Sequence, residues 1–288
     1  PYLADRPLVL TRYPDGIDGK SFYQKDAPVY APGWIRLETL WSEGSEREIR
    51  YFVIENEEGL AYIANMAAIP LHIWSSRVSS LQYPDWCILD LDPKGAPFAH
   101  VVKVAREIHR ICEHAELPHF VKTTGSTGLH VLIPLGARYT HEQSRAMAEL
   151  LANCVVKQLP DIATVARHLD AREGKVYVDY LQNILGKTVA GVYAVRAKPF
   201  ATVSTPLDWT ELTDELTSTA SFPRRPAQLD DASRGFGTPG VGIWTGSYVE
   251  DAEAVYDRPT EIQLNDPQTL YRRWEDSQWS PFDVDLAR

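Results

Sequence analysis

Short runs of apolar and β-branched residues, separated by turn signals, fill the first part of the chain and predict a β-rich segment over residues 7–64. Pro14-Asp15-Gly16 indicates a turn in this segment, because Pro presets φ and Gly accepts a positive φ. The runs that predict strands are Leu8–Leu10, Ile35–Leu37 and Arg50–Ile54.

The next stretch alternates between helical and strand-like patterns. Residues 59–68 predict a short helix that ends near Pro70, and a strand follows at Leu71–Trp74. Trp86–Leu89 is a compact apolar strand that leads directly into Asp90. A helix comes after Pro97, because apolar residues recur there at spacings of three and four: Val101, Ala105, Ile108, Cys112 and Ala115.

A strand, a small polar loop and a second strand are predicted over residues 120–133, with the loop at Thr124–Gly128. A second helix is expected over residues 141–158, and Lys175–Tyr180 predicts another strand. Pro and Gly become frequent after Pro206. Residues 222–250 therefore resemble a loop or linker, and helical patches follow from Asp266.

Composition indicates an ordinary globular protein, with 44% hydrophobic and 24% charged residues. No apolar stretch approaches the roughly 20 residues of a membrane helix, so we expect no membrane association. Cys87, Cys112 and Cys154 lie far apart and form no CxxC motif, which favours reduced core residues of a cytosolic protein.

The net charge of −10 argues against a broad DNA-coating surface. The Asp and Glu residues are unevenly distributed along the chain, however. From residue 230 onward there are twelve Asp and Glu against five Arg, a net charge of −7, so the rest of the chain carries −3. A local basic groove upstream of residue 230 stays compatible with this balance.

Asp90 and Asp92 are the first candidates for chemistry. Residues two apart on a strand point to the same side, and Pro93 ends the strand there. Two carboxylates so close repel each other unless a cation such as Mg²⁺ or Mn²⁺ lies between them. Asp179, at the end of another apolar strand, adds a third carboxylate and suggests a two-metal centre. The alternative is an exposed acidic strand end with a turn-forming Asp.

A second group of candidates could bind an anion. The Thr124–Gly128 loop offers backbone N–H groups and hydroxyls, and His130 follows it, although an ordinary hairpin turn explains the same residues. Arg172, Lys187 and Arg196, with His72 upstream, could supply the donors that a triphosphate needs. Taken singly, each of these cations is equally typical of solvated surface charge.

The remaining histidines and tryptophans suggest simpler roles. His109, His114 and His119 are spaced five apart, which does not line one helix face, so we expect surface residues rather than metal ligands. Phe22 and Tyr23 are an aromatic pair among the cations Arg12, Lys20 and Lys25, and could stack bases or sugars. Packing rather than base stacking is expected for Trp74, Trp86, Trp209, Trp244, Trp274 and Trp279.

Seven blocks of the chain, in order, resemble the primase-polymerase domain of bacterial ligase D, in the archaeo-eukaryotic primase superfamily. Together they extend over about the first 210 residues. In the block at residues 123–135, the family often has Lys where this chain has Thr127. The blocks are RYPDGIDGKSFYQK (12–25), GLAYIANMAAIPLHIW (59–74), ILDLDPKG (88–95), TTGSTGLHVLIPL (123–135), REGKVYVDYLQN (172–183), GKTVAGVYAVRAKP (186–199) and VSTPLDW (203–209).

The resemblance implies an α+β primase-polymerase fold, in which an RRM-like antiparallel catalytic sheet packs with a second β-rich subdomain and flanking helices. We expect a catalytic domain over residues 1–221, with its β-rich part at about 1–80 and its catalytic sheet at about 81–221. Residues 222–288 would be an acidic, loop-rich C-terminal extension with helical patches.

The resemblance also implies template-directed addition of nucleotides to a 3′-hydroxyl at DNA gaps or double-strand breaks. Two Mn²⁺ or Mg²⁺ ions, an NTP or dNTP substrate, a DNA ligase and the Ku protein would take part, in the bacterial cytoplasm near the nucleoid. Asp90, Asp92 and Asp179 would bind the metals. DNA would contact Arg12, Phe22, Tyr23 and Lys25. The nucleotide would contact His72, Thr124, Ser126, His130, Arg172, Gln182, Lys187 and Arg196.

Two other functions stay open on the residues alone. One is a non-catalytic module that binds DNA ends or Ku. The other is a different DxD metal-dependent transferase, such as a glycosyltransferase, or a phosphohydrolase. A haloacid-dehalogenase-type hydrolase is disfavoured, because Pro93 and Lys94 follow the acidic pair.

Overall fold

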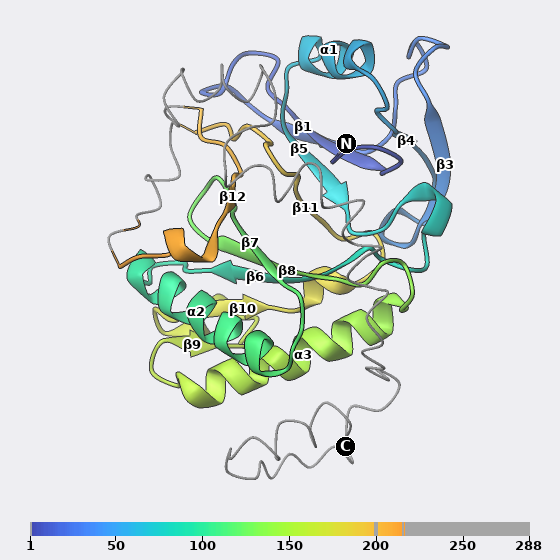
Figure 1. Cartoon of the computed structure of the whole chain (residues 1–288). Helices are drawn as coiled ribbons and strands as arrows, with labels where there is room; N and C mark the ends of the chain where they lie inside the picture. Colours follow the sequence, from blue (N-terminus) through green and yellow to red (C-terminus); the bar gives the residue numbers. More distant parts are fainter. Residues whose placement is uncertain (1, 199–200, 215, 217–288) are drawn as a thin grey trace.

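A computed structural model describes residues 2–198, 201–214 and 216, which form two six-stranded β-sheets flanked by helices (Figure 1). The expected loop at 222–250, the helical patches from Asp266 and the three tryptophans Trp244, Trp274 and Trp279 lie outside the described residues. The described part confirms the expected mixed fold of two β-rich units with few helices.

The first sheet is built mostly from the N-terminal strands, in the order β11-β5-β1-β4-β3, with β2 paired to β1. Its sixth strand, β11, comes from far along the chain and pairs antiparallel with β5. The β-rich unit therefore extends beyond its expected sequence range of about 1–80. The bounds are β1 Leu8–Arg12, β2 Phe22–Gln24, β3 Leu37–Ser42, β4 Arg47–Phe52, β5 Ala68–Trp74 and β11 Thr188–Ala190.

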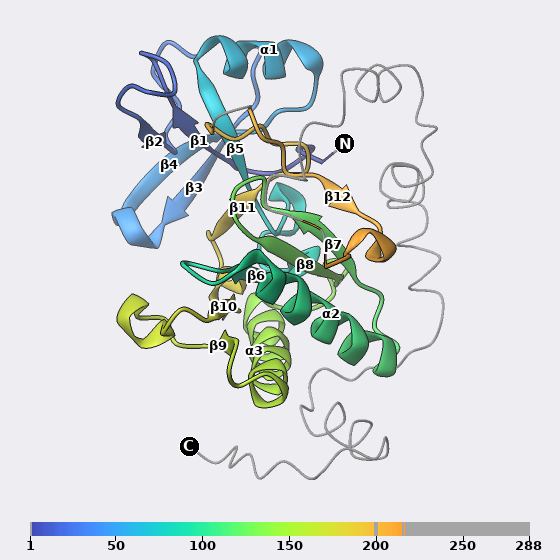
Figure 2. The same ribbon diagram turned by 90° about the vertical axis from the view of Figure 1, so that its left-hand side faces the viewer.

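The second sheet has the order β12-β7-β8-β6-β10-β9 and is antiparallel except for the pair of β9 and β10. Helices α2 (Phe98–His114) and α3 (His141–Gln158) lie on the side of this sheet that faces away from the first sheet (Figure 2). Its strands are β6 Trp86–Asp92, β7 Phe120–Thr123, β8 Leu129–Pro134, β9 Ala163–Thr164, β10 Val176–Asp179 and β12 Pro206–Leu207.

The alternation of side chains along β6 divides the interior into two cores. Cys87, Leu89 and Leu91 pack with the buried faces of α2 and α3. Trp86 and Ile88 point the other way and pack with residues of the first sheet. Because successive strand residues face opposite sides, Asp90 and Asp92 share the side that faces the first sheet. The acidic pair thus lies between the two sheets, beyond the apolar part of their interface.

The helices follow the local signals closely. The predicted apolar stripe of α2 is buried, and α3 has the predicted bounds. Helix α3 begins at a capping box, in which the Thr140 hydroxyl accepts from the Gln143 N–H and the Gln143 side chain accepts from the Thr140 N–H. Single turns of 3₁₀ helix complete the inventory: η1 Glu43–Ser45, η2 Val78–Ser80, η3 Leu169–Arg172, η4 Leu181–Asn183 and η5 Trp209–Glu211.

Several predicted boundaries are wrong. The helix expected over residues 59–68 is α1 (Glu57–Asn65), which starts earlier because the Asn56 side chain caps the Gly59 N–H. It also ends earlier, since Ala67 adopts a left-handed φ of 56° and β5 begins at the next residue. The strand expected at Ile35–Leu37 begins only at its last residue, because Ile35 closes a turn onto Pro32.

All three cysteines are buried and unpaired by disulfides, as expected. Across the described residues, no helix is both long and apolar enough to span a membrane.

Candidate active site

A row of charged side chains crosses four neighbouring strands of the second sheet. Lys122 on β7 lies opposite His130 on β8, His130 lies opposite Asp90 on β6, and Asp90 lies opposite Asp179 on β10. Cross-strand partners point to the same face of a sheet, so all four side chains face the first sheet. Two cationic or basic groups thus stand next to two acids on one rigid surface.

Three members of the row, His130, Asp90 and Asp179, line a pocket with a volume of about 310 Å³ between the two sheets, and Lys122 is buried next to His130. The first sheet contributes His72 from β5 and residues 188–190 of β11 to the walls. Ten of the eleven residues expected to bind metal or nucleotide line this pocket: His72, Asp90, Asp92, Thr124, Ser126, His130, Arg172, Asp179, Gln182 and Arg196. The eleventh, Lys187, is exposed outside the lining, but it lies near enough to lower the pKa of Asp179.

The environments of Asp90 and Asp179 shift their pKa values in opposite directions. Burial raises the pKa of Asp90, but His130, Lys122 and Arg196 lower it by more, so the net shift is downward. Burial and the neighbouring Asp90 raise the pKa of Asp179, although its carboxylate accepts from the Leu181 N–H. Burial therefore disfavours the ionised form of Asp179 most, and the like charge of Asp90 adds to this effect.

Asp92 is paired with a buried cation. Arg172 Nη1 lies 2.8 Å from Asp92 Oδ2, and only 7% of Arg172 is exposed. The guanidinium also lies over the Tyr177 ring, 3.9 Å from its centroid, and donates to the carbonyls of Ala166 and Arg167. These contacts fix the guanidinium at the edge of the pocket, where it faces the acids.

The hydroxyl of Thr124 organises the polar loop that was expected to bind phosphate. It accepts from the backbone N–H groups of Ser126 and Gly128, at 3.1 and 3.2 Å. Gly125 has a φ of 69°, and a Cβ there would lie 2.7 Å from Arg196 Cγ and 2.8 Å from Ser204 N. The loop is therefore held tightly against the segment that carries Arg196.

Burial lowers the pKa of both histidines of the pocket. The pKa of His72 falls to about 4, because of burial and the nearby Arg196, His130 and Lys122. Burial and Lys122 likewise lower the pKa of His130, against the effect of Asp90, whose Oδ1 lies 3.3 Å from His130 Nε2. The other ring nitrogen of His130, Nδ1, is buried and has no hydrogen-bond partner among the described residues.

Lys122 is the pocket-side residue that sequence reasoning missed. It is fully buried, and its Nζ donates to Ala190 O at 3.1 Å and to Ser204 Oγ at 2.6 Å, which joins the second sheet to β11. Burial lowers its pKa to about 7. A signal existed, because a hairpin closed by the loop 124–128 pairs Lys122 with His130.

The residues expected to contact DNA lie at the mouth of the pocket and on the β1–β2 hairpin. Phe22, Tyr23 and Lys25 are exposed, and the Tyr23 ring lies 6.1 Å from that of His72. Arg12 is more engaged than expected. It donates to Met66 O at 2.7 Å and to Gln24 Oε1 at 3.1 Å, and it lies over the Phe22 ring.

The surface position expected for three histidines is wrong for His119, which is buried. It packs in a cluster with His109 and Trp209 at ring distances of 4.9 and 5.0 Å. His114 is exposed as expected. Trp74 and Trp86 are buried and Trp209 is partly buried against the core, in agreement with their expected packing roles.

The donor set of the pocket fits a hard divalent cation. Asp90 and Asp179 are cross-strand partners, and Asp92 shares their face. Burial and, to a smaller extent, the charge of Asp90 raise the pKa of Asp179, and a bound cation would offset both effects. Carboxylate oxygens are the ligands that Mg²⁺ and Mn²⁺ prefer. Fold and site together define an α+β protein with a pocket of acidic and basic side chains between two sheets.

Comparison with known proteins places the chain in a family. The model of the LigD primase-polymerase domain matches residues 1–233, and the chain belongs to this family. The bifunctional non-homologous end joining protein LigD of Bacillus subtilis is 32% identical over 219 residues, which cover 75% of this chain. The multifunctional LigD of Mycobacterium bovis is 28% identical over 296 residues, which cover all of it.

The chain spans about a third of these relatives, 35% and 36% of their lengths. A solved structure of the polymerase domain of Mycobacterium tuberculosis ligase D in complex with DNA matches with a TM-score of 0.71 and 27% identity. The match covers 81% of this chain and 83% of that one.

Proposed function

We propose that the chain is a template-directed DNA repair polymerase. It would add deoxyribonucleotides or ribonucleotides to a 3′-hydroxyl at DNA gaps and double-strand-break ends. The observation that carries this proposal is the group of acids in the pocket, Asp90, Asp92 and Asp179, beside His130 on the neighbouring strand. Membership of the LigD primase-polymerase family and the structural similarity to a DNA-bound polymerase domain support it.

In this proposal Asp90, Asp92 and Asp179 hold two divalent ions, Mn²⁺ or Mg²⁺. Such ions, when bound, make a hydroxyl a better nucleophile and neutralise charge on a triphosphate. The chain itself orients the acids. The sheet fixes Asp90 and Asp179, whereas Arg172 holds the Asp92 carboxylate by its ion pair.

The incoming triphosphate would lie along the cationic side of the pocket. Arg172, Arg196 and Lys187 supply charge, and fixed donors cost little reorganisation when charge develops on the departing pyrophosphate. Thr124 and Ser126 contribute hydroxyls, and the neutral His130 contributes a ring nitrogen. His72 and Gln182 would lie beside the nucleoside, since they line the opposite wall and the acidic end of the pocket respectively.

DNA would approach over the β1–β2 hairpin. Tyr23 beside His72 offers a stacking surface at the mouth of the pocket, and Phe22, Arg12 and Lys25 extend it. By analogy with the end-joining proteins that the chain resembles, we propose a DNA ligase and Ku as partners, in the cytoplasm near the nucleoid.

Primer extension on a gapped duplex tests the proposal. We expect extension with Mn²⁺ and either dNTPs or rNTPs, and a loss of at least about 100-fold in Asp90→Ala, since preorganised charge of this kind contributes that much. Asp161→Asn, an exposed acid outside the pocket, is the control and should extend normally. DNA binding without extension, also in the full-length protein, would indicate a scaffold. Turnover of a sugar nucleotide would indicate another DxD transferase.

A further inference from the structure

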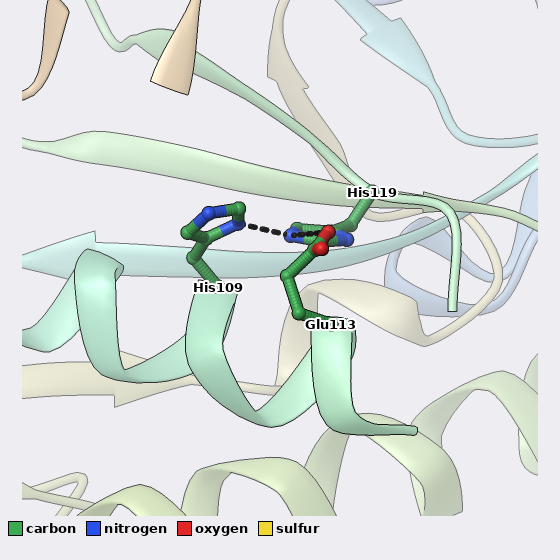
Figure 3. A group of neighbouring side chains, drawn as sticks. All are labelled: His109, Glu113 and His119. Atoms are coloured by element: carbon green, nitrogen blue, oxygen red, sulfur yellow. Dashed lines mark hydrogen bonds and ion pairs between the residues drawn. The ribbon is translucent and has the colours of Figure 1, made fainter. Parts of the chain in front are cut away.

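A second cluster of metal-binding side chains lies under helix α2, on the opposite side of the second sheet from the acidic pocket. His109 and Glu113 lie one turn apart on α2, and His119 lies just before β7 and points toward them (Figure 3). One ligand atom from each residue lies within 4.8 Å of the others. Among the described residues, this is the group of three or more His, Cys, Asp or Glu whose ligand atoms all lie this close to one another.

His119 has the orientation of a metal-binding histidine. Its Nδ1 lies 2.7 Å from Leu117 O, and because a carbonyl only accepts, Nδ1 carries the proton. The lone pair is therefore on Nε2, which faces His109 Nδ1 at 2.6 Å and Glu113 Oε1 at 3.9 Å. A carbonyl that holds the far nitrogen is the usual second partner of a metal-bound histidine.

Trp209 fixes the other ring and shapes the site. It stacks on His109 with ring centroids 4.3 Å apart and an interplanar angle of 15°. Its Nε1 donates to His119 O at 3.2 Å, which ties the stack to the start of β7. Glu113 is 66% exposed, so the cluster is closed by Trp209 on one side and open to water on the other.

We propose that His109, Glu113 and His119 bind a transition-metal ion of the Zn²⁺ class, in a site distinct from the acidic pocket. Two imidazoles and one carboxylate favour Zn²⁺, Co²⁺ or Ni²⁺ over Mg²⁺. With the ion absent, His109 donates to His119. Binding moves that proton to Nε2, the other ring nitrogen of His109, and separates the two coordinating nitrogens by about 0.7 Å, because two nitrogens each ~2.0 Å from a tetrahedral ion lie about 3.3 Å apart.

The proposed ion would join the end of α2 to the residue just before β7, beside the Trp209 ring of η5. These three elements are brought together by packing, so the ion would act as a cross-link that is present only in the folded state. Ligand binding to the folded state alone raises the melting temperature, and the site therefore predicts stabilisation by Zn²⁺. This inference does not depend on polymerase activity.

Calorimetric titration of ZnCl₂ into the whole chain tests the site. The acidic pocket is first removed as a competitor by the double substitution Asp90→Asn and Asp92→Asn. We expect about one Zn²⁺ per chain in that background, and affinity reduced at least about tenfold by His109→Gln or Glu113→Gln. His114→Gln, an exposed histidine on the same helix, is the matched control and should bind as its parent does.

Glu113 is exposed, so Glu113→Gln tests the site without disturbing the core, unlike a substitution of the buried His119. Co²⁺ provides a second readout, because four-coordinate Co²⁺ with nitrogen ligands has strong visible absorption. We expect this absorption in the double variant and its loss in the Glu113→Gln and His109→Gln derivatives. The absence of Zn²⁺ binding in the double variant, or binding unchanged by both derivatives, would overturn the proposal.

Discussion

The close approach of Gly128 to β6 makes a sharp prediction about the active site. A Cβ on Gly128 would lie 2.0 Å from the carbonyl oxygen of Leu91, the residue between the two acids of the pair. Both partners are backbone, so no side chain rotation relieves the contact. Gly128→Ala therefore forces the start of β8 away from β6 at the point where Asp90 and Asp92 are presented.

The size of the effect follows from the geometry. Ordinary contacts of a Cβ begin at 3.4 Å, so the two strands must separate by about 1.4 Å at this point. Overpacking of this kind costs about 3 kcal/mol when the backbone has to move. A displacement of about 1 Å between reacting groups lowers a rate by about 100-fold. A 100-fold loss corresponds to about 2.7 kcal/mol, so we expect losses of similar size in primer extension and in stability.

Urea unfolding and primer extension with Mn²⁺ measure the two effects on the same variant. Gly33→Ala is the matched control, because a Cβ there meets no atom within 4 Å and its φ is not positive. The control should match the parent in both assays. If Gly128→Ala unfolds at the parent's urea midpoint and extends within about twofold of its rate, the close approach of β8 to β6 does not position the acids.

Three further predictions concern Asn183, Arg172 and the buried cysteines. The Asn183 side chain makes hydrogen bonds of 2.8 Å with both the N–H and the carbonyl of Ile88. Asn183→Leu should therefore lower the free energy of unfolding, measured in urea, by about 3 kcal/mol. The control Asn153→Leu, at an exposed position, should cost under about 1 kcal/mol in the same assay. Arg172→Lys should raise the KM for the nucleotide at least about tenfold, because one ammonium cannot reach Asp92 and two carbonyls together, and a normal KM would contradict this role. Burial raises the thiol pKa to about 12 in both Cys87 and Cys154, and it raises the thiol pKa of Cys112 as well. Ellman's reagent at pH 8 should therefore label these cysteines only in denaturant. Labelling of the native protein would show that the core opens.

Much of the scaffold was predictable from local pattern. The bounds of α3 and the buried stripe of α2 follow from residue spacing and a capping sequence, which act within a few residues. The shared face of Asp90 and Asp92 follows from the period of a strand, and Pro93 marks the end of that strand. The errors at α1 and at Ile35 lie at boundaries, where a cap or a turn outweighs the apolar pattern.

The tertiary structure decided which of these local features meet. Strand period places Asp90 on a face, but only the strand order puts Asp179 on one side of it and His130 on the other. Arg172 reaches Asp92 across 80 residues, and β11 crosses to the first sheet to form a pocket wall. The sequence alone offered Arg172 as one scattered cation among several.

Two side chains show most clearly what local pattern leaves open. Lys122 in an apolar strand and His119 in a loop both have the chemistry of surface residues. Each is buried because distant segments close over it, Ala190 and Ser204 in one case and Trp209 in the other. Periodicity along the chain determined which face each strand residue takes. Burial, charge environment and pKa were decided by packing between segments distant in sequence, since they depend on neighbours that no local pattern specifies.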